Sequence, residues 1–230
     1  MATVTLATLR SKVRTRADMP TASFITDAEL DEIINSAWGE LYDLLVGTFE
    51  DYNLSSGTIS VVSGTDTYSL ASDFYKVRGV DLLISGAAGN FVPLKRYEWS
   101  ERGDLSSVYR GATLVSGGES LRYTIRGDAT GNPKIVFAPV PDGSYSVKVW
   151  YVPERVTLTV VQDLILVASW EEFLVTLAAK MCLAKEENEV GHLEADLARL
   201  RARIAAAAGQ RDADAPRTMV RRRGRGGDCG

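Results

Sequence analysis

The 230-residue chain has few of the side chains that form cross-links or metal sites, because it holds only two cysteines and one histidine. Cys182 lies in a predicted helix and Cys229 next to the last residue, so we expect no disulfide framework. His192 alone cannot supply a site of two or three histidine ligands, and it lies in a charged helical stretch with no cleft suggested around it. The segment RGDATGNPK has the wrong spacing for a phosphate-binding loop. We therefore predict no metal, no cofactor and no catalytic residue, and a protein that is not an enzyme.

Long hydrophobic runs are also missing. No stretch approaches the roughly 18 consecutive apolar residues of a membrane-spanning helix, and MATVTLATLRSKVR lacks the apolar centre of a signal peptide. We expect synthesis in the cytoplasm and no membrane partner.

Positive charge is scarce except at the C-terminus. The whole chain has a net charge of −4, but residues 217–230 hold five arginines and one aspartate, so residues 1–216 have a net charge of −8. A folded nucleic-acid binder usually presents a basic face. Any contact with a polyanion is therefore predicted to involve the end of the chain.

The first 50 residues predict two helices. In TDAELDEIINSAWGELYDLL the apolar residues recur every three or four positions, and Thr26 with Glu29 has the spacing of a capping box. The preceding segment LATLRSKVRTRA predicts a shorter helix that ends before Pro20. Together the two segments are typical of an αα-hairpin.

Residues 54–155 change to β-branched and aromatic residues interrupted by glycine, which predicts an antiparallel sheet or a small sandwich. The segment from Tyr145 to Tyr151 alternates with period two, and Pro141-Asp142-Gly143 predicts a turn before it. Tyr97 and Trp99 alternate with charged residues, a pattern that indicates one side of a strand or short helix, or aromatic rings available to a base or a partner.

A helical pattern returns at ASWEEFLVTLAAKMCLAKEENEVGHLEADLARLRARIAAAAG, with a second capping box predicted at Ser169 and Glu172. Gly191 is expected to mark a kink or a break, and Gly209 to end the helix. The spacing of four, three and four predicts a coiled-coil seam for subunit–subunit packing, although packing within the subunit explains it equally well; the seam residues are Leu193, Leu197, Leu200 and Ile204.

These segments predict an α+β fold: a helical bundle, made of an N-terminal helix pair and a long C-terminal helix, with an inserted antiparallel β domain and an extended C-terminal tail. The predicted limits are 1–50 with 160–208 for the helical bundle domain, 51–159 for the β-rich insertion and 209–230 for a flexible arginine-rich extension.

The extension has its basic residues at Arg217, Arg221, Arg222, Arg223 and Arg225, in RTMVRRRGRGG. Guanidinium groups fork to phosphate or carboxylate, so two targets fit equally: nucleic acid, or an acidic groove on a protein partner. An unstructured solubilising end is a third interpretation.

The order of these segments resembles the head-to-tail adaptor, or head-completion, proteins of tailed bacteriophages, particularly of short-tailed phages. The likeness covers roughly residues 5–205 and is carried by the helix pair, YSLASDFYKVRGVDL, RYEW, IVFAPVPDGSYSVKVWYVP and SWEEFLVTLAAKMCLAKEEN.

This resemblance implies a structural part of the virion, located at its neck. Such adaptors are expected to form a homo-oligomeric ring, here a dodecamer, that joins the portal protein to the tail or nozzle protein. The ring would close the DNA-filled head and let genomic DNA pass through its lumen. The resemblance also implies that the C-terminal extension docks on the portal. The alternative is a nucleic-acid-binding accessory protein that uses its arginine/glycine tail.

Overall fold

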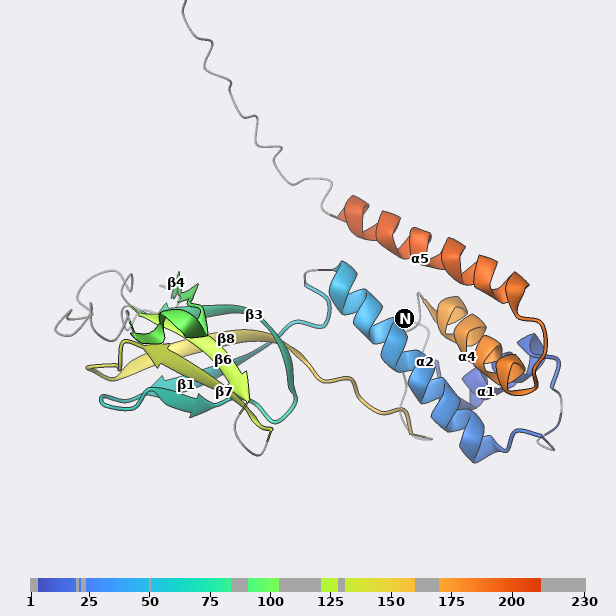
Figure 1. Cartoon of the computed structure of the whole chain (residues 1–230), viewed down its shortest axis with the longest axis horizontal. Coiled ribbons are helices and arrows are strands. Elements are labelled where there is room, and N and C mark those ends of the chain that lie inside the picture. The colour runs from blue at the N-terminus through green and yellow to red at the C-terminus, as the bar shows by residue number, and fades with distance from the viewer. Residues whose placement is uncertain are drawn as a thin grey trace, which may run out of the picture. The chain divides into compact units, whose positions relative to one another are not determined.

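A computed structural model describes residues 4–19, 21, 24–49, 51–83, 91–103, 121–127, 131–159 and 170–211 (Figure 1). Within these ranges the chain is α+β, as predicted, with four α-helices and two four-stranded sheets. Contacts divide it into two compact units, Met1–Ala37 with Val160–Gly230, and Trp38–Thr159. We call the first the helical unit and the second the β unit.

The helical unit begins with α1 (Leu6–Arg16), whose start is fixed by Thr5. The Thr5 hydroxyl accepts a hydrogen bond of 3.2 Å from the backbone amide of Thr8, which satisfies one free amide of the first turn. Leu6, Leu9 and Val13 are buried at spacings of three and four, so α1 packs one face inward.

Helix α2 (Asp27–Thr48) starts as the sequence predicts, but with half of the predicted capping box. The Glu29 amide donates to the Thr26 hydroxyl at 3.3 Å. The Glu29 carboxylate instead forms an ion pair with Lys185, the last residue of α4 (Glu171–Lys185). The boundary between the two units falls inside α2, after Ala37.

The predicted long C-terminal helix is in fact two helices, α4 (Glu171–Lys185) and α5 (Gly191–Arg211). The predicted break is confirmed, and Gly191 is the first residue of α5. Glu187 in the intervening turn has a φ of 59°, a left-handed conformation that cannot continue a helix. The predicted end at Gly209 is wrong, since α5 continues to Arg211. Trp170 occupies the N-cap of α4 in place of the predicted Ser169, and its side chain makes no cap hydrogen bond.

Helix α4 is the most deeply buried element of the helical unit. All seven residues of one run, 173–179, are buried, and the helix contacts both α1 and α5. A surface helix buries one stripe, whereas a helix buried all round is covered by neighbours on several sides. Helix α4 is therefore the centre of this unit.

The β unit contains two sheets, as in the predicted sandwich. The first has the strand order β1-β8-β3-β4 and the second β2-β7-β6-β5. Strands β5 and β6 pair in parallel, and the other described strand pairs are antiparallel. The bounds are β1 Ser55–Val61, β2 Thr67–Ser69, β3 Phe74–Leu83, β4 Phe91–Pro93, β5 Lys95–Arg96, β6 Arg122–Gly127, β7 Pro133–Ala138 and β8 Tyr145–Pro153, with a short 3₁₀ helix, η1, at Trp99–Glu101.

The core of the β unit combines side chains from both sheets. Val80 and Val149 come from the first sheet, and Ile135 and Phe137 from the second, all 2% exposed or less. Because side chains alternate along a strand, each sheet directs its other set of residues outward. The turn predicted at 141–143 links β7 and β8, which lie in different sheets, so the two strands do not form a hairpin.

The second half of α2 packs within the β unit. The Trp38 indole donates to the Val156 carbonyl at 3.0 Å. The Arg78 guanidinium of β3 donates to the carbonyls of Val46 and Phe49, at 2.6 and 3.0 Å, at the end of α2. Free carbonyls at a helix C-terminus need such partners. The predicted domain limits state which segments of the chain fold independently of each other. Contacts within one folded chain do not test this, so the limits stay a prediction.

Candidate functional site

Charged contacts tie α1 to α2. Arg10 donates from Nε and Nη2 to the two carboxylate oxygens of Asp31, and this hydrogen bonding raises the pKa of Arg10. One turn later Arg14 contacts Asp27 at 2.7 Å. A two-pronged arginine–carboxylate pair fixes orientation as well as distance. These contacts hold α1 antiparallel to the start of α2.

Further ion pairs link α4 and α5 to each other and to the first two helices. They are Lys12–Glu171 at 2.6 Å, Arg16–Asp196 at 2.7 Å, Lys180–Glu194 at 2.8 Å, Lys185–Glu29, and Arg199–Glu172 at 3.7 Å. Arg201 and Arg203 stack instead on the rings of Phe173 and Trp170, at 5.7 Å. Every lysine and arginine whose side chain is described in the helical unit thus contacts a carboxylate or an aromatic ring. Exposed pairs stabilise little singly, but as a network they specify one arrangement of the helices.

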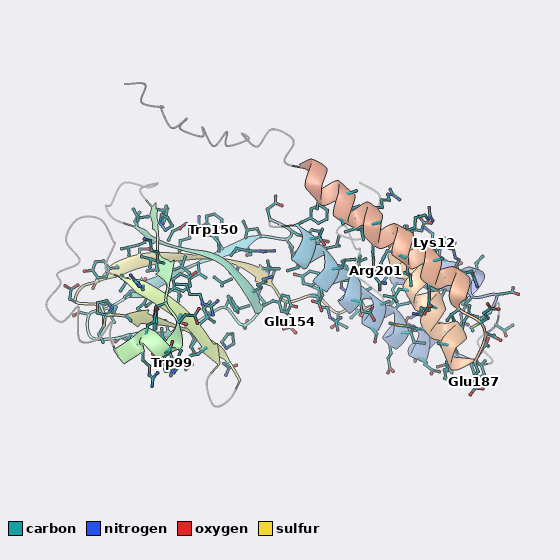
Figure 2. The ribbon with its side chains drawn as sticks, turned by 45° about the horizontal axis from the view of Figure 1, so that its top comes forward. Lys12, Trp99, Trp150, Glu154, Glu187 and Arg201 are labelled. Atoms are coloured by element: carbon teal, nitrogen blue, oxygen red, sulfur yellow. The ribbon has the colours of Figure 1, made fainter. Side chains whose placement is uncertain are left out.

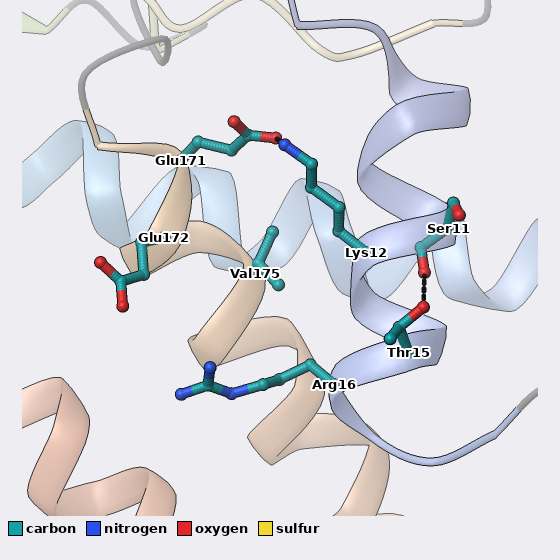
Figure 3. Close-up of a pocket in the computed structure, with 7 residues that line it drawn as sticks. All are labelled: Ser11, Lys12, Thr15, Arg16, Glu171, Glu172 and Val175. Atoms are coloured by element: carbon teal, nitrogen blue, oxygen red, sulfur yellow. Dashed lines mark hydrogen bonds and ion pairs between the residues drawn. The ribbon is translucent and has the colours of Figure 1, made fainter.

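A pocket of about 440 Å³ lies between α1 and α4 (Figure 3). Its lining residues are Ser11, Lys12, Thr15, Arg16, Glu171, Glu172 and Val175. Lys12 and Glu171 point toward each other across it, and the Thr15 hydroxyl donates to the Ser11 carbonyl at 2.9 Å. The lining has no histidine or cysteine to act as base or nucleophile.

The β unit carries a group of cations that we call the basic strip: Lys95, Arg102, Arg122 and Arg126. Lys95 and Arg122 are partners in the register of the parallel pair β5 and β6. The guanidinium carbons of Arg102 and Arg126 each lie 5.1 Å from the ring centre of Trp99, which is 44% exposed (Figure 2). Cation–π contact holds the two guanidinium groups in place on the surface.

Cys182 and His192 have no catalytic surroundings. Cys182 is buried in α4, and burial raises the pKa of its thiol to about 11, as for a residue that packs as a small hydrophobe. His192 is exposed in the first turn of α5. Among the described residues, no three His, Cys, Asp or Glu side chains gather as metal ligands. Nor does any helix in that part of the chain have the length and apolar character needed to cross a membrane.

The family of the chain follows from a match that covers almost its whole length. A family model described as SU10 adaptor protein matches residues 4–225. The chain belongs to the SU10 adaptor family. None of the curated proteins compared with it matches. Membership confirms the resemblance to phage head-to-tail adaptors, and it indicates a structural adaptor of the phage particle that works with other head and tail proteins. The family is not a known enzyme family.

The predicted seam of this SU10 adaptor is buried within the single chain. Leu193, Leu197, Leu200 and Ile204 are exposed by 0%, 1%, 3% and 0%, and α5 contacts α4. Packing inside the subunit therefore accounts for the heptad-like spacing. Subunit–subunit packing through these residues stays a prediction, which a single chain does not test.

The five arginines predicted to dock on the portal lie outside the described residues, so their role also stays a prediction. The basic strip was not predicted from the sequence. Its residues are spread from Lys95 to Arg126 and meet only because β5 and β6 pair and η1 brings Trp99 between two arginines. The one sequence signal was the alternation of aromatic and charged residues around Trp99.

Proposed function

We propose that this SU10 adaptor forms a homo-oligomeric ring that joins the portal at the capsid vertex to the tail or nozzle protein. The ring closes the DNA-filled head and provides the channel for DNA exit. The observation that carries the proposal is the family match over residues 4–225. By that resemblance the ring is a dodecamer.

The charge distribution supports a channel for DNA. Residues 1–216 have a net charge of −8. A basic lumen would hold the genome by its phosphates, because each neutralised phosphate releases counterions. An acidic body lets DNA pass without binding it.

The C-terminal extension is the proposed portal contact. Arginine forks bidentately to carboxylates, so Arg217, Arg221, Arg222, Arg223 and Arg225 suit an acidic groove on the portal. The extension has few apolar residues, so we expect it to gain order when it binds. Protease resistance of this segment in the isolated protein would count against the proposal.

The test compares the full chain with a version that ends at Arg211, the last residue of α5. Native mass is measured for each alone and with the portal ring from the same genome. We expect the full chain to add to the portal as a ring and the shortened chain to fail. A third version with the five arginines changed to glutamine keeps the length and removes the charge.

Two outcomes overturn the proposal. If the shortened chain adds to the portal as well as the full chain does, the extension is not the portal contact. If neither adds while the full chain alone retains DNA, the protein is instead a nucleic-acid-binding accessory protein with an arginine/glycine tail.

A further inference from the structure

The second sheet of the β unit has an unusual charge distribution. Its strands β2, β5, β6 and β7 hold five lysines and arginines and no aspartate or glutamate. The chain as a whole has more acidic than basic residues. The strands of the first sheet hold three lysines and arginines and one aspartate, so the second sheet carries the larger net positive charge.

The basic strip forms no ion pair within the described part of the β unit. None of its four cations lies within ion-pair distance of a described carboxylate. The nearby Glu101 accepts instead from the backbone amide of Glu98, within η1. Lys95, Arg102 and Arg126 are exposed, so the strip presents its charge to solvent.

The helical unit has the opposite imbalance. Each lysine and arginine whose side chain is described in this unit already contacts a carboxylate or an aromatic ring. The unit therefore has more carboxylates than basic partners for them. Three glutamates gather in the turn between α4 and α5, which we call the acidic turn (Glu186–Glu189). Glu187 and Glu189 are exposed and form no ion pair with a described residue (Figure 2 labels Glu187).

We propose that the basic strip of one copy binds the acidic turn of the neighbouring copy. The inference rests on the proposed ring and names one of its subunit contacts. A closed ring needs a heterologous interface, in which two different patches of the same chain meet. The strip and the acidic turn are two such patches with complementary charge. Contact with Trp99 already restricts the guanidinium groups of Arg102 and Arg126. Binding a carboxylate through two hydrogen bonds therefore costs them less side-chain entropy.

DNA fits the strip less well than carboxylates do. Binding to a duplex draws on a basic field that neutralises many phosphates, and the strip lies on a chain with a net charge of −4. A short acidic segment requires only local complementarity.

The experiment uses charge reversal in the full chain. Strip variant S carries Lys95→Glu and Arg126→Glu, and turn variant T carries Glu187→Lys and Glu189→Lys; all four positions are exposed, so the fold should be retained. Lys76→Glu, an exposed reversal on the first sheet, is the matched control. Circular dichroism and the melting temperature verify folding, and native mass counts the copies assembled alone and on the portal ring.

We expect S and T each to need at least about tenfold more protein for half-assembly, with the control unchanged. In an equimolar mixture the reversed strip of S faces the reversed turn of T, and the unchanged strip of T faces the unchanged turn of S. The mixture should therefore assemble as wild type does, in rings of alternating copies. A chain that carries all four reversals should assemble by itself.

Other results overturn the inference. Rings unaffected by S or T show that the strip and turn are not in contact. Loss of assembly in S without rescue by T assigns the strip another occupant. Loss of binding to a short DNA duplex in S, with rings intact, makes the strip a nucleic-acid surface. If wild type assembles neither alone nor on the portal, the ring itself is wrong, and the inference fails with it.

Discussion

Replacing Leu197 by alanine separates packing within the subunit from packing between subunits. The side chain is 1% exposed in the single chain, and it lies on α5 where that helix contacts α4. Truncation of a buried leucine costs about 2–5 kcal/mol, since it removes apolar burial and leaves a cavity. For a residue this well covered we expect about 3 kcal/mol, which lowers the folding equilibrium constant about 150-fold.

The assay is urea unfolding of the unassembled chain, followed by far-UV circular dichroism. Leu197→Ala should lower the unfolding midpoint without a change in slope. The control is Ala198→Gln, an exposed neighbour on the same helix, because both residues favour helix and the expected effect is below about 0.5 kcal/mol. If Leu197→Ala leaves the unassembled chain as stable as this control, the leucine does not pack within the subunit, and the reasoning from burial is refuted.

Three further predictions concern the two units separately. Arg78→Met removes the guanidinium nitrogen that donates to the carbonyls of Val46 and Phe49 at the end of α2, so thermal unfolding should show a loss of about 2 kcal/mol. Burial raises the pKa of Tyr52 to about 12, so the folded state holds the phenolic proton more tightly than the unfolded state does. The stability that this contributes is complete below about pH 10 and is lost as the pH rises toward 12. Tyr52→Phe should reduce this loss of stability at high pH. In a Cys229→Ser background Cys182 should react with a thiol reagent only after unfolding, and reaction at the rate of an exposed thiol in the native protein would contradict its burial.

Local pattern predicted the α+β class and most helix starts, because caps and apolar spacing act within a few residues. Thr26 fixes the start of α2, as expected, but the carboxylate of Glu29 pairs with Lys185, a residue 156 positions away. The end of α5 was predicted two residues too early, since a single glycine costs only about 1 kcal/mol in a helix. Tertiary context decides such cases.

The candidate surfaces were less predictable than the fold. The spacing of Leu193 and Leu197 indicates one apolar stripe but not whether a helix of the same chain or of a neighbour covers it. The basic strip depends on the parallel pairing of β5 with β6, which no local signal in the sequence specifies. Sheet register is set by packing across the whole unit.

The position of β8 has a consequence for the order of folding during synthesis. This strand pairs with both β1 and β3, so the first sheet cannot close until residue 153 has left the ribosome. Helix α1, although it emerges first, finds its partner α4 only after residue 171. Chains emerge N-terminus first, and domains generally fold as units. If the β unit folds as one domain, it is complete on the ribosome before the helical unit, whose α4 and α5 are translated last. An adaptor built this way can present its finished helical unit to a partner only once translation is nearly over.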